Sequence, residues 1–304
     1  MASVSIPSSA GSVAISCSKT DGAVGPAARP RVGRDGLLRL GFERRGRRTV
    51  LTGRQYRLPL QALEPVDLDG DGGLTLMLLN PTGGVLGGDV LDTAAVLGPG
   101  SRVCLTTPSA TRIYRAVGEP AVQRFTATVG EGAALEYMPD HLIPSPGARL
   151  IQTTELTLEE GAAAIVGDAW VAGRVARGEC WRFSRLDLGL VIRDRHGLLL
   201  KDRAVLTGRT EWDRLGGAEG FPYMATFVAG APSRGEWAIL ADELADALSR
   251  VAGVNVGITP LIRGGLLARV LASSAPALRA CLDALWARCR LNVLGLPPAN
   301  LRKL

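Results

Sequence analysis

Few side chains in this sequence have the type and spacing that chemistry requires, and the two histidines come first among them. His141 follows Asp140 and lies shortly after Glu136, so an imidazole nitrogen and carboxylate oxygens could make a transient contact with a divalent metal ion. A polar loop with no ligand role is the alternative interpretation. His196 lies in a stretch typical of a turn, and neither histidine belongs to a set that combines a nucleophile with a base. We therefore predict no catalytic residues and no enzymatic activity.

A glycine-rich segment at residues 80–89, Asn-Pro-Thr-Gly-Gly-Val-Leu-Gly-Gly-Asp, is the most unusual stretch of the chain. Gly83, Gly84, Gly87 and Gly88 each lose much backbone entropy on folding, so the fold or a partner must require them. A phosphate-binding loop would end in Gly-Lys-Ser or Gly-Lys-Thr and lead into a helix, whereas Asp89 places a negative charge there. We interpret the segment either as close packing at a sheet corner or as a loop shaped to meet another chain.

The acidic run Asp67, Asp69 and Asp71 resembles the opening of a calcium-binding loop. The position that should hold a bidentate glutamate is Leu78, and the flanking segments have the pattern of strands. We therefore predict a hairpin turn at this run and no calcium site.

Composition and charge limit the classes of partner. The chain has 304 residues, of which 46% are hydrophobic and 21% charged, so it can bury a sizeable core. The formal net charge is +6, carried almost wholly by arginine, and it does not by itself indicate nucleic-acid binding. One basic cluster surrounds Gly46, where we predict a solvated hairpin turn. The alternative is that the four arginines of this cluster bind an acidic partner protein; they are Arg44, Arg45, Arg47 and Arg48.

The cysteines and the chain ends indicate the compartment. Five scattered cysteines form no closely spaced pair, which argues against a disulfide framework and against a structural zinc site. No apolar run reaches the roughly 20 residues that a bilayer requires, so no membrane association is expected. Residues 1–33 are interpreted as a flexible tail without a secretion signal, and residues 296–304 as a C-terminal tail. We expect a cytoplasmic protein.

The elements that position these residues are mainly strands. Short runs with a period of two residues recur between residues 36 and 206. Three similar turns follow strand-like runs at spacings of about 30 residues: Gly98-Pro99-Gly100, Gly130-Glu131-Gly132 and Glu159-Glu160-Gly161. Such a repeat favours stacked β-sheets of the β-solenoid type, because one layer cannot cover its own apolar faces.

Two helices are expected toward the C-terminus. Ser233 and Glu236 have the spacing of a capping box at the start of a helix near residues 234–251. A second helix is predicted near residues 274–290, with a buried stripe that contains Leu278, Leu282, Leu285 and Cys289 and leaves Arg290 elsewhere on the helix. The stripes should cover the sheets, and residues 34–295 are interpreted as one domain.

The glycine-rich segment, taken together with residues 105–115, resembles the UreD family of urease accessory proteins, called UreH in some organisms. The resemblance extends over about residues 34–295, and its further matches are Leu135–Pro139, Gly147–Arg149, Gly173–Glu179 and the helical segment Arg269–Arg290. It implies a fold of stacked sheets with a pair of helices near the C-terminus. It also implies a maturation factor that has no enzymatic activity.

The resemblance further implies partners and a cargo. Members of this family bind apo-urease and UreF, which holds the GTPase UreG, and they help to deliver nickel to the urease active site. GTP then belongs to UreG, and this chain should hold nickel only transiently and no cofactor tightly. We expect it to be dimeric within the larger accessory complex.

Weak nickel binding suits scattered carboxylates better than a closed cysteine and histidine site. Our candidates for lining a metal passage are Asp89, Asp92, Glu136, Asp140, His141 and Glu179. We expect Gly83, Gly84, Gly87, Gly88, Tyr114 and Arg115 to shape either this passage or the surface that binds UreF. A pure adaptor without metal passage is one alternative, and a β-solenoid carbohydrate-active enzyme is another.

Overall fold

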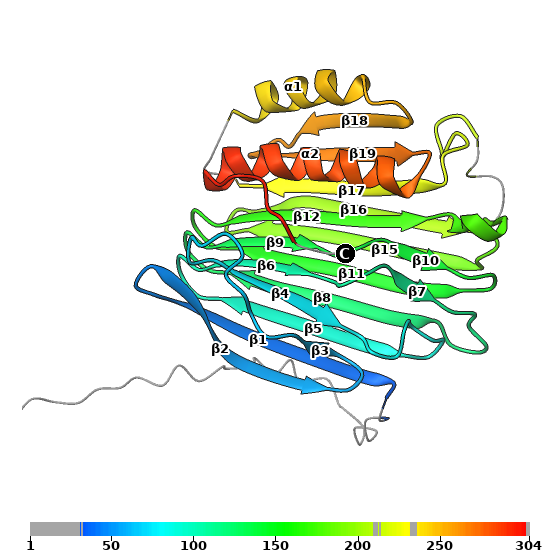
Figure 1. Cartoon of the computed structure of the whole chain (residues 1–304), viewed down its shortest axis with the longest axis horizontal. Coiled ribbons are helices and arrows are strands. Elements are labelled where there is room, and N and C mark those ends of the chain that lie inside the picture. Colours follow the sequence, from blue (N-terminus) through cyan, green and yellow to red (C-terminus); the bar gives the residue numbers. More distant parts are fainter. Residues whose placement is uncertain (1–30, 32, 209–211, 213, 232–235, 302–304) are drawn as a thin grey trace, which may run out of the picture. The chain divides into compact units, whose positions relative to one another are not determined.

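The computed structural model describes residues 31, 33–208, 212, 214–231 and 236–301, and two large sheets dominate this part of the chain (Figure 1). The seven-stranded sheet has the order β16 (Gly197–Thr207), β15 (Arg185–Asp194), β11 (Arg149–Leu158), β8 (Ala121–Val129), β5 (Val90–Leu97), β1 (Asp35–Arg45) and β2 (Arg48–Arg57). The ten-stranded sheet has the main path β18 (Val254–Pro260), β19 (Gly265–Ala272), β17 (Tyr223–Gly230), β12 (Ala163–Val171), β9 (Ala134–Met138), β6 (Arg102–Thr106), β4 (Leu74–Leu79) and β3 (Gln61–Ala62).

Four short strands complete the described part of the fold. The strands β7 (Thr111–Ile113) and β10 (Leu142–Pro144) pair in parallel beside the main path of the ten-stranded sheet, where β10 also pairs with β12. The strands β13 (Gly173–Arg174) and β14 (Glu179–Cys180) form a separate ribbon around the short 3-10 helix η1 (Val175–Arg177).

The middle of each sheet is built from parallel strands contributed by successive coils. The chain runs from β5 through a turn into β6, then from β8 into β9 and from β11 into β12, and like strands pair in parallel. The turns also stack, because Gly100 N donates to Glu131 O and Gly132 N to Glu160 O, both at 2.8 Å. Gly100, Gly132 and Gly161 have φ angles of 65°, 62° and 64°, the left-handed conformation that favours glycine. The predicted β-solenoid-like fold is confirmed.

Both sheets change from parallel to antiparallel pairing toward their ends. In the seven-stranded sheet β16 and β2 are antiparallel to their neighbours, and in the ten-stranded sheet β3 and the three strands β17, β19 and β18 are antiparallel. The hairpins predicted at Gly46 and at residues 194–197 are the turns that connect β1 with β2 and β15 with β16.

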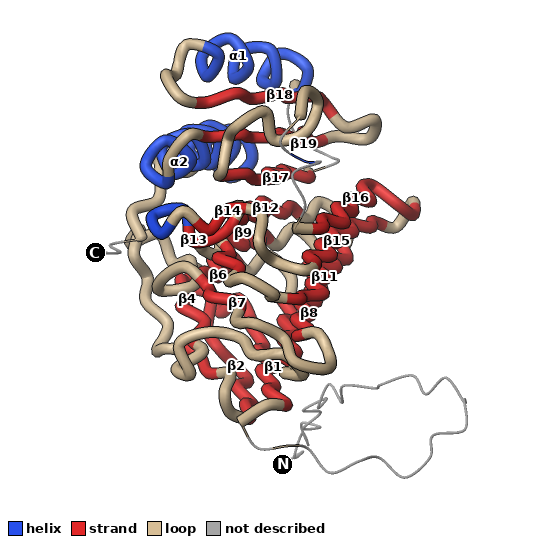
Figure 2. Tube along the Cα trace, turned by 90° about the vertical axis from the view of Figure 1, so that its right-hand side faces the viewer, coloured by secondary structure: helices blue, strands red, loops and turns tan. Residues whose placement is uncertain are grey.

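Alternation along β12 shows how the apolar residues divide into two cores. Ala164 and Val166 belong to the core between the two sheets, whereas Ala163 and Ile165 belong to the core under the helices. Figure 2 shows the sheets along their strands, with helix α2 on the outer side of the ten-stranded sheet. Both faces of this sheet are therefore covered, the inner one by the other sheet and the outer one by helices.

The two helices, α1 (Trp237–Ser249) and α2 (Ala275–Leu294), pack with β17, β18 and β19. None of these three strands was predicted from the sequence. Almost every residue of β17 is buried, so its apolar run lacks the alternation of a half-buried strand, whereas β18 does alternate at Val254, Val256 and Ile258. Ser274 caps α2 by accepting from Ala277 N at 3.3 Å. The residue that precedes α1 is Glu236, which makes no side-chain cap, so the predicted capping box is wrong; Ser233 itself lies outside the described residues.

Other expectations concern chain features outside the sheets. None of the four cysteines in the described part of the chain forms a disulfide. Among the described residues no helix is both long and apolar enough to cross a bilayer. Of the proposed tails, residues 1–30, 32 and 302–304 lie outside the described residues, whereas residues 296–301 are described and include the buried Leu301. The domain boundaries at 34 and 295 stay a prediction.

A buried ion cluster joins α2 to the ten-stranded sheet. Arg290 is 3% exposed, and its Nε donates to Glu136 Oε2 at 3.0 Å while its Nη2 donates to Asp69 Oδ2. Its Nη1 donates to the backbone oxygen of Pro297 at 2.7 Å, and Trp286 Nε1 donates to Glu136 Oε2 at 2.6 Å. Burial raises the pKa of Glu136, and these donors oppose the increase. Arg290 lies off the stripe of Leu278, Leu282, Leu285 and Cys289, as the sequence pattern predicted, but it is buried, which the pattern did not predict.

We predict that Arg290→Met lowers the free energy of unfolding by about 3 to 5 kcal/mol, because it leaves Glu136 and Asp69 without their buried counter-charge. Urea unfolding followed by circular dichroism measures the loss. The matched control is Arg288→Met on the same helix, whose partner Glu243 is about half exposed and whose loss should cost less than about 1 kcal/mol. Equal losses in the two variants would contradict a structural role for the cluster.

Candidate functional site

The glycine-rich segment packs backbone against backbone at the junction with β7. Val85 N donates to Arg112 O at 2.8 Å, and Tyr114 N donates to Val85 O at 2.9 Å. A Cβ atom on Gly84 would lie 2.6 Å from Arg112 O, and one on Gly87 would lie 2.7 Å from the Cα atom of Ala116. These two positions therefore have no room for a side chain. This explains why the fold requires glycine there despite the backbone entropy that glycine loses on folding.

Asp89, the last residue of the glycine-rich segment, is buried and holds the segment in place by its side-chain contacts. Its side chain is 4% exposed, its Oδ2 accepts from Leu86 N at 2.8 Å, and its Oδ1 lies 3.5 Å from Arg34 Nε. The neighbouring Gly87 O accepts from Arg34 Nη2 at 2.6 Å. The carboxylate thus holds the loop and the start of β1 together.

Tyr114 and Arg115 lie next to this loop, as the sequence led us to expect. The hydroxyl of Tyr114 lies 3.4 Å from Gly83 O, and Arg115 forms an isolated antiparallel bridge with Ala148. The structure therefore joins the glycine-rich loop, Tyr114 and Arg115 into one surface region at an end of the coils.

The six residues predicted to line a metal passage are not brought together. Asp92 is 42% exposed and pairs with Arg124 at 2.9 Å, and Glu179 pairs with Arg174 at 2.5 Å. Glu136 belongs to the buried ion cluster. Within the described ranges no group of three histidine, cysteine, aspartate or glutamate side chains is arranged to hold a metal ion. Their role in a passage stays a prediction.

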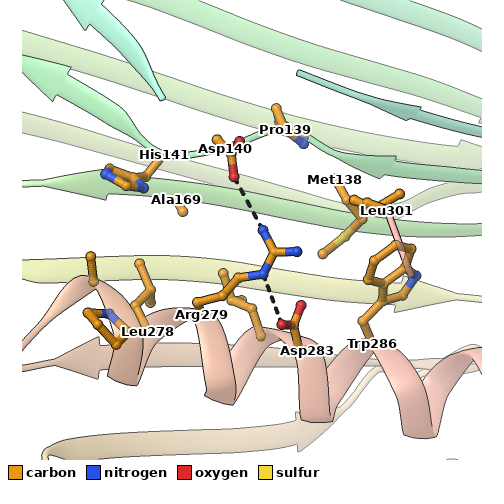
Figure 3. A pocket seen from close by; sticks show the side chains of 13 residues that line it. Met138, Pro139, Asp140, His141, Ala169, Leu278, Arg279, Asp283, Trp286 and Leu301 are labelled. Carbon is orange, nitrogen blue, oxygen red and sulfur yellow. Dashed lines mark hydrogen bonds and ion pairs between the residues drawn. The ribbon is translucent and has the colours of Figure 1, made fainter. Parts of the chain in front are cut away.

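Asp140 and His141 do share a cavity, which has a volume of about 300 Å³ and lies beside α2 (Figure 3). Figure 3 shows Arg279 between two carboxylates, with Nη1 3.4 Å from Asp140 Oδ1 and Nε 2.9 Å from Asp283 Oδ2. Burial lowers the pKa of His141, so its imidazole is neutral at neutral pH and one of its nitrogens can accept. Both carboxylates of this cavity pair with Arg279, which makes them poor ligands for a cation.

A second polar cavity, of about 450 Å³, lies between the two sheets near β16 and β17. Asp168 enters it from β12 and Asp202 from β16, and Arg269 Nη1 donates to Thr226 Oγ1 at 2.6 Å. Arg269 Nη2 also donates to Asp202 Oδ1 at 2.5 Å. None of these residues was predicted from the sequence to belong to a site.

Asp168 is the chemically distinctive group in this inter-sheet cavity. Gln152 Nε2 donates to its Oδ1 at 3.0 Å, and no ion pair among the described residues involves it. Burial raises its pKa from 3.8 to about 6, with a smaller contribution in the same direction from Asp202, while Gln152 and Arg269 act against the increase. Near neutral pH this carboxylate is ionised at a cost, and a cation bound to it would relieve that cost.

One sequence signal could have identified Asp168. It is the single charged residue in the strand segment Ala163–Val171, and it shares the face of Ala164, Val166 and Trp170, which point into the core between the sheets. A carboxylate in such a position is rare unless it is paired or functional.

Comparison with known proteins gives one consistent family. The family model described as UreD urease accessory protein matches residues 34–303. The chain is 36% identical over 269 residues to "Urease accessory protein UreD" of Cupriavidus pinatubonensis, which covers 87% of this chain and 92% of the relative. It is 34% identical over 279 residues to the protein of the same name in Alkalilimnicola ehrlichii, covering 90% and 92%. "Urease accessory protein UreD 2" of Streptomyces griseus is 35% identical over 275 residues, covering 88% and 93%.

We predict that Gly84→Ala destabilises the protein by about 1 to 3 kcal/mol, because the added methyl group overlaps Arg112 O and the Tyr114 ring. Gly257→Ala in β18 is the control, since its Cβ would meet no atom within 4 Å. Thermal unfolding measures both variants. Equal stability of Gly84→Ala and wild type would show that the loop does not need this close approach.

Asp168→Asn should stabilise the protein by about 1 to 3 kcal/mol at neutral pH. The pKa of Asp168 is higher in the folded chain than in the unfolded one, so its contribution is favourable in acid and is lost as the pH rises through about 6. The free energy of unfolding, measured in urea from pH 4 to pH 7.5, should therefore fall less for Asp168→Asn than for wild type. Parallel curves for the two proteins would contradict a raised pKa.

Proposed function

This chain belongs to the UreD family of urease accessory proteins and so has a role in urease maturation, and we propose that it is the scaffold that joins apo-urease to UreF. In this proposal UreF holds the GTPase UreG, GTP is used by UreG alone, and the chain acts in the cytoplasm as part of a dimeric assembly. The match to the family over residues 34–303 carries the proposal.

We further propose that nickel, as cargo, passes between the two sheets through the inter-sheet cavity. Asp168 supports this because it offers an ionised oxygen donor that no cationic side chain of the described chain neutralises by an ion pair. Oxygen ligands release nickel more readily than thiolates do, and a passage needs release as much as binding. The stacked coils contribute rigid walls, since β11, β12 and β15 are each paired on both sides.

The carboxylates that the sequence analysis put forward fit this role less well. Glu136 and Glu179 are each held by an arginine, and Asp92 lies on the outer face of the seven-stranded sheet beside Arg124. We therefore rank Asp168 before them as a passage residue. A pure adaptor, which assembles the complex without guiding nickel, is the competing function that the experiment below separates.

We predict that Asp168→Asn lowers nickel transfer to apo-urease by about tenfold when nickel is limiting, which corresponds to the loss of one charge-assisted contact. The readouts are the nickel content and the activity of urease after co-expression with the accessory proteins. Asp246→Asn, which also removes one carboxylate but from the exposed surface of α1, is the matched control and should transfer nickel like wild type.

Co-purification with UreF must be unchanged in both variants, so that a loss of transfer is not a loss of assembly. Because Asp168→Asn is also expected to be more stable than wild type, misfolding cannot explain a drop in activity. Full nickel transfer by Asp168→Asn in an intact complex would favour the pure adaptor.

A further inference from the structure

A third cavity, of about 490 Å³, lies at the end of the coils where β7, β10 and the β13–β14 ribbon meet. We call it the arginine cavity, because its lining among the described residues has three guanidinium groups and no aspartate or glutamate. Its polar lining includes Arg112, Arg174, Arg177, Tyr114, Tyr223 and His141. Arginine and tyrosine are the residues enriched where proteins bind one another.

The charge of this cavity is only partly balanced. Arg174 Nε donates to Glu179 Oε2 at 2.5 Å, a contact that uses one edge of that guanidinium. Within the described part of the chain, the side chains of Arg112 and Arg177 make no hydrogen bond and no ion pair. Two guanidinium forks are therefore available to an incoming carboxylate, and a planar carboxylate matches such a fork with two parallel hydrogen bonds.

The backbone that carries these arginines is held in place by strand pairing and close packing. Arg112 lies on β7 and is in register with Ile143 of β10. Gly173 pairs with Cys180 across the β13–β14 ribbon, where a Cβ atom on Gly173 would lie 2.1 Å from Glu179 O. Trp181, which follows the ribbon, contacts the Trp170 ring edge-on at 6.1 Å. Binding would thus need little ordering of the loop, which favours affinity.

The volume and the positive charge of the arginine cavity limit which ligands could occupy it. Its volume is more than ten times the ~30 Å³ share of one water molecule, so a single small anion would leave most of it and one of the forks empty. Its positive charge repels a nickel ion and separates it from the proposed passage. A peptide segment that presents two or more carboxylates fits both the volume and the charge.

We propose that the arginine cavity is a docking site for an acidic segment of a partner protein, with Arg112 and Arg177 binding its carboxylates. The inference rests on the proposed function, because a scaffold needs such surfaces, and it assigns one of them to defined residues. Binding of an acidic partner protein, which the sequence suggested for the hairpin arginines near Gly46, is thereby proposed for the arginine cavity instead.

The test uses the full chain and a fluorescein-labelled octapeptide of alternating glutamate and glycine, with fluorescence anisotropy as the readout. The variant Arg112→Gln/Arg177→Gln should bind this peptide about tenfold more weakly than wild type, as expected when charge-assisted contacts are lost. The matched control is Arg47→Gln/Arg48→Gln, which removes the same charge from the exposed β1–β2 hairpin and should bind like wild type. A glutamine and glycine peptide should not bind.

Three results would overturn the proposal. The first is that both double variants weaken peptide binding equally, and the second is that the glutamine peptide binds as tightly as the glutamate peptide. The third is that phosphate or acetate saturates Arg112 and Arg177 while the glutamate peptide does not bind. All four substituted side chains are exposed, so the variants should unfold at the wild-type midpoint. The outcome is independent of nickel transfer. If wild type delivers nickel but does not bind the peptide, this inference fails alone; if it binds the peptide but delivers none, the proposed function fails alone.

Discussion

The contact between Arg290 and the two carboxylates of Glu136 and Asp69 is the interaction on which the covering of the ten-stranded sheet depends. It joins α2, the central strand β9, the loop before β4 and, through Pro297, the segment after the helix. A buried ion cluster contributes little net stability compared with apolar packing, but breaking it is costly, because the remaining charges stay buried. The cluster therefore fixes where α2 lies on the sheet more than it strengthens the fold.

The repeated part of the fold could be predicted from the sequence because its physical signals are local. Glycine turns that need a left-handed conformation recur at nearly constant spacing, and alternating strands lie between them. The antiparallel strand β17 could not be predicted in this way, whereas β18 has an alternating pattern at Val254, Val256 and Ile258 that could have been recognised. Helices cover the outer face of the sheet they join, so β17 is buried on both sides and reads as a plain apolar run.

The candidate site likewise has a part that could be predicted from local sequence signals and a part that could not. The glycine-rich loop was predictable, because four glycines close together signal a backbone constraint that the contacts of Gly84 and Gly87 explain. Asp168 could have been singled out as the one charged residue of its strand, but its proximity to Asp202 and Arg269 could not, because that depends on strand register across two sheets, which a single sequence does not reveal. The same holds for Arg290, which lies off the apolar stripe of α2 and is buried only through partners distant in sequence.

The antiparallel pairing at the sheet ends has a consequence for self-assembly. A stack of parallel coils has open edges on which a second molecule could continue the same pattern, and repetition of that step would produce a fibre. Here each main path terminates instead in a strand of reversed direction: β2, β16, β3 or β18. The parallel hydrogen-bond pattern of the coils is thus confined to the middle of each sheet, and the outermost strand pairs are antiparallel.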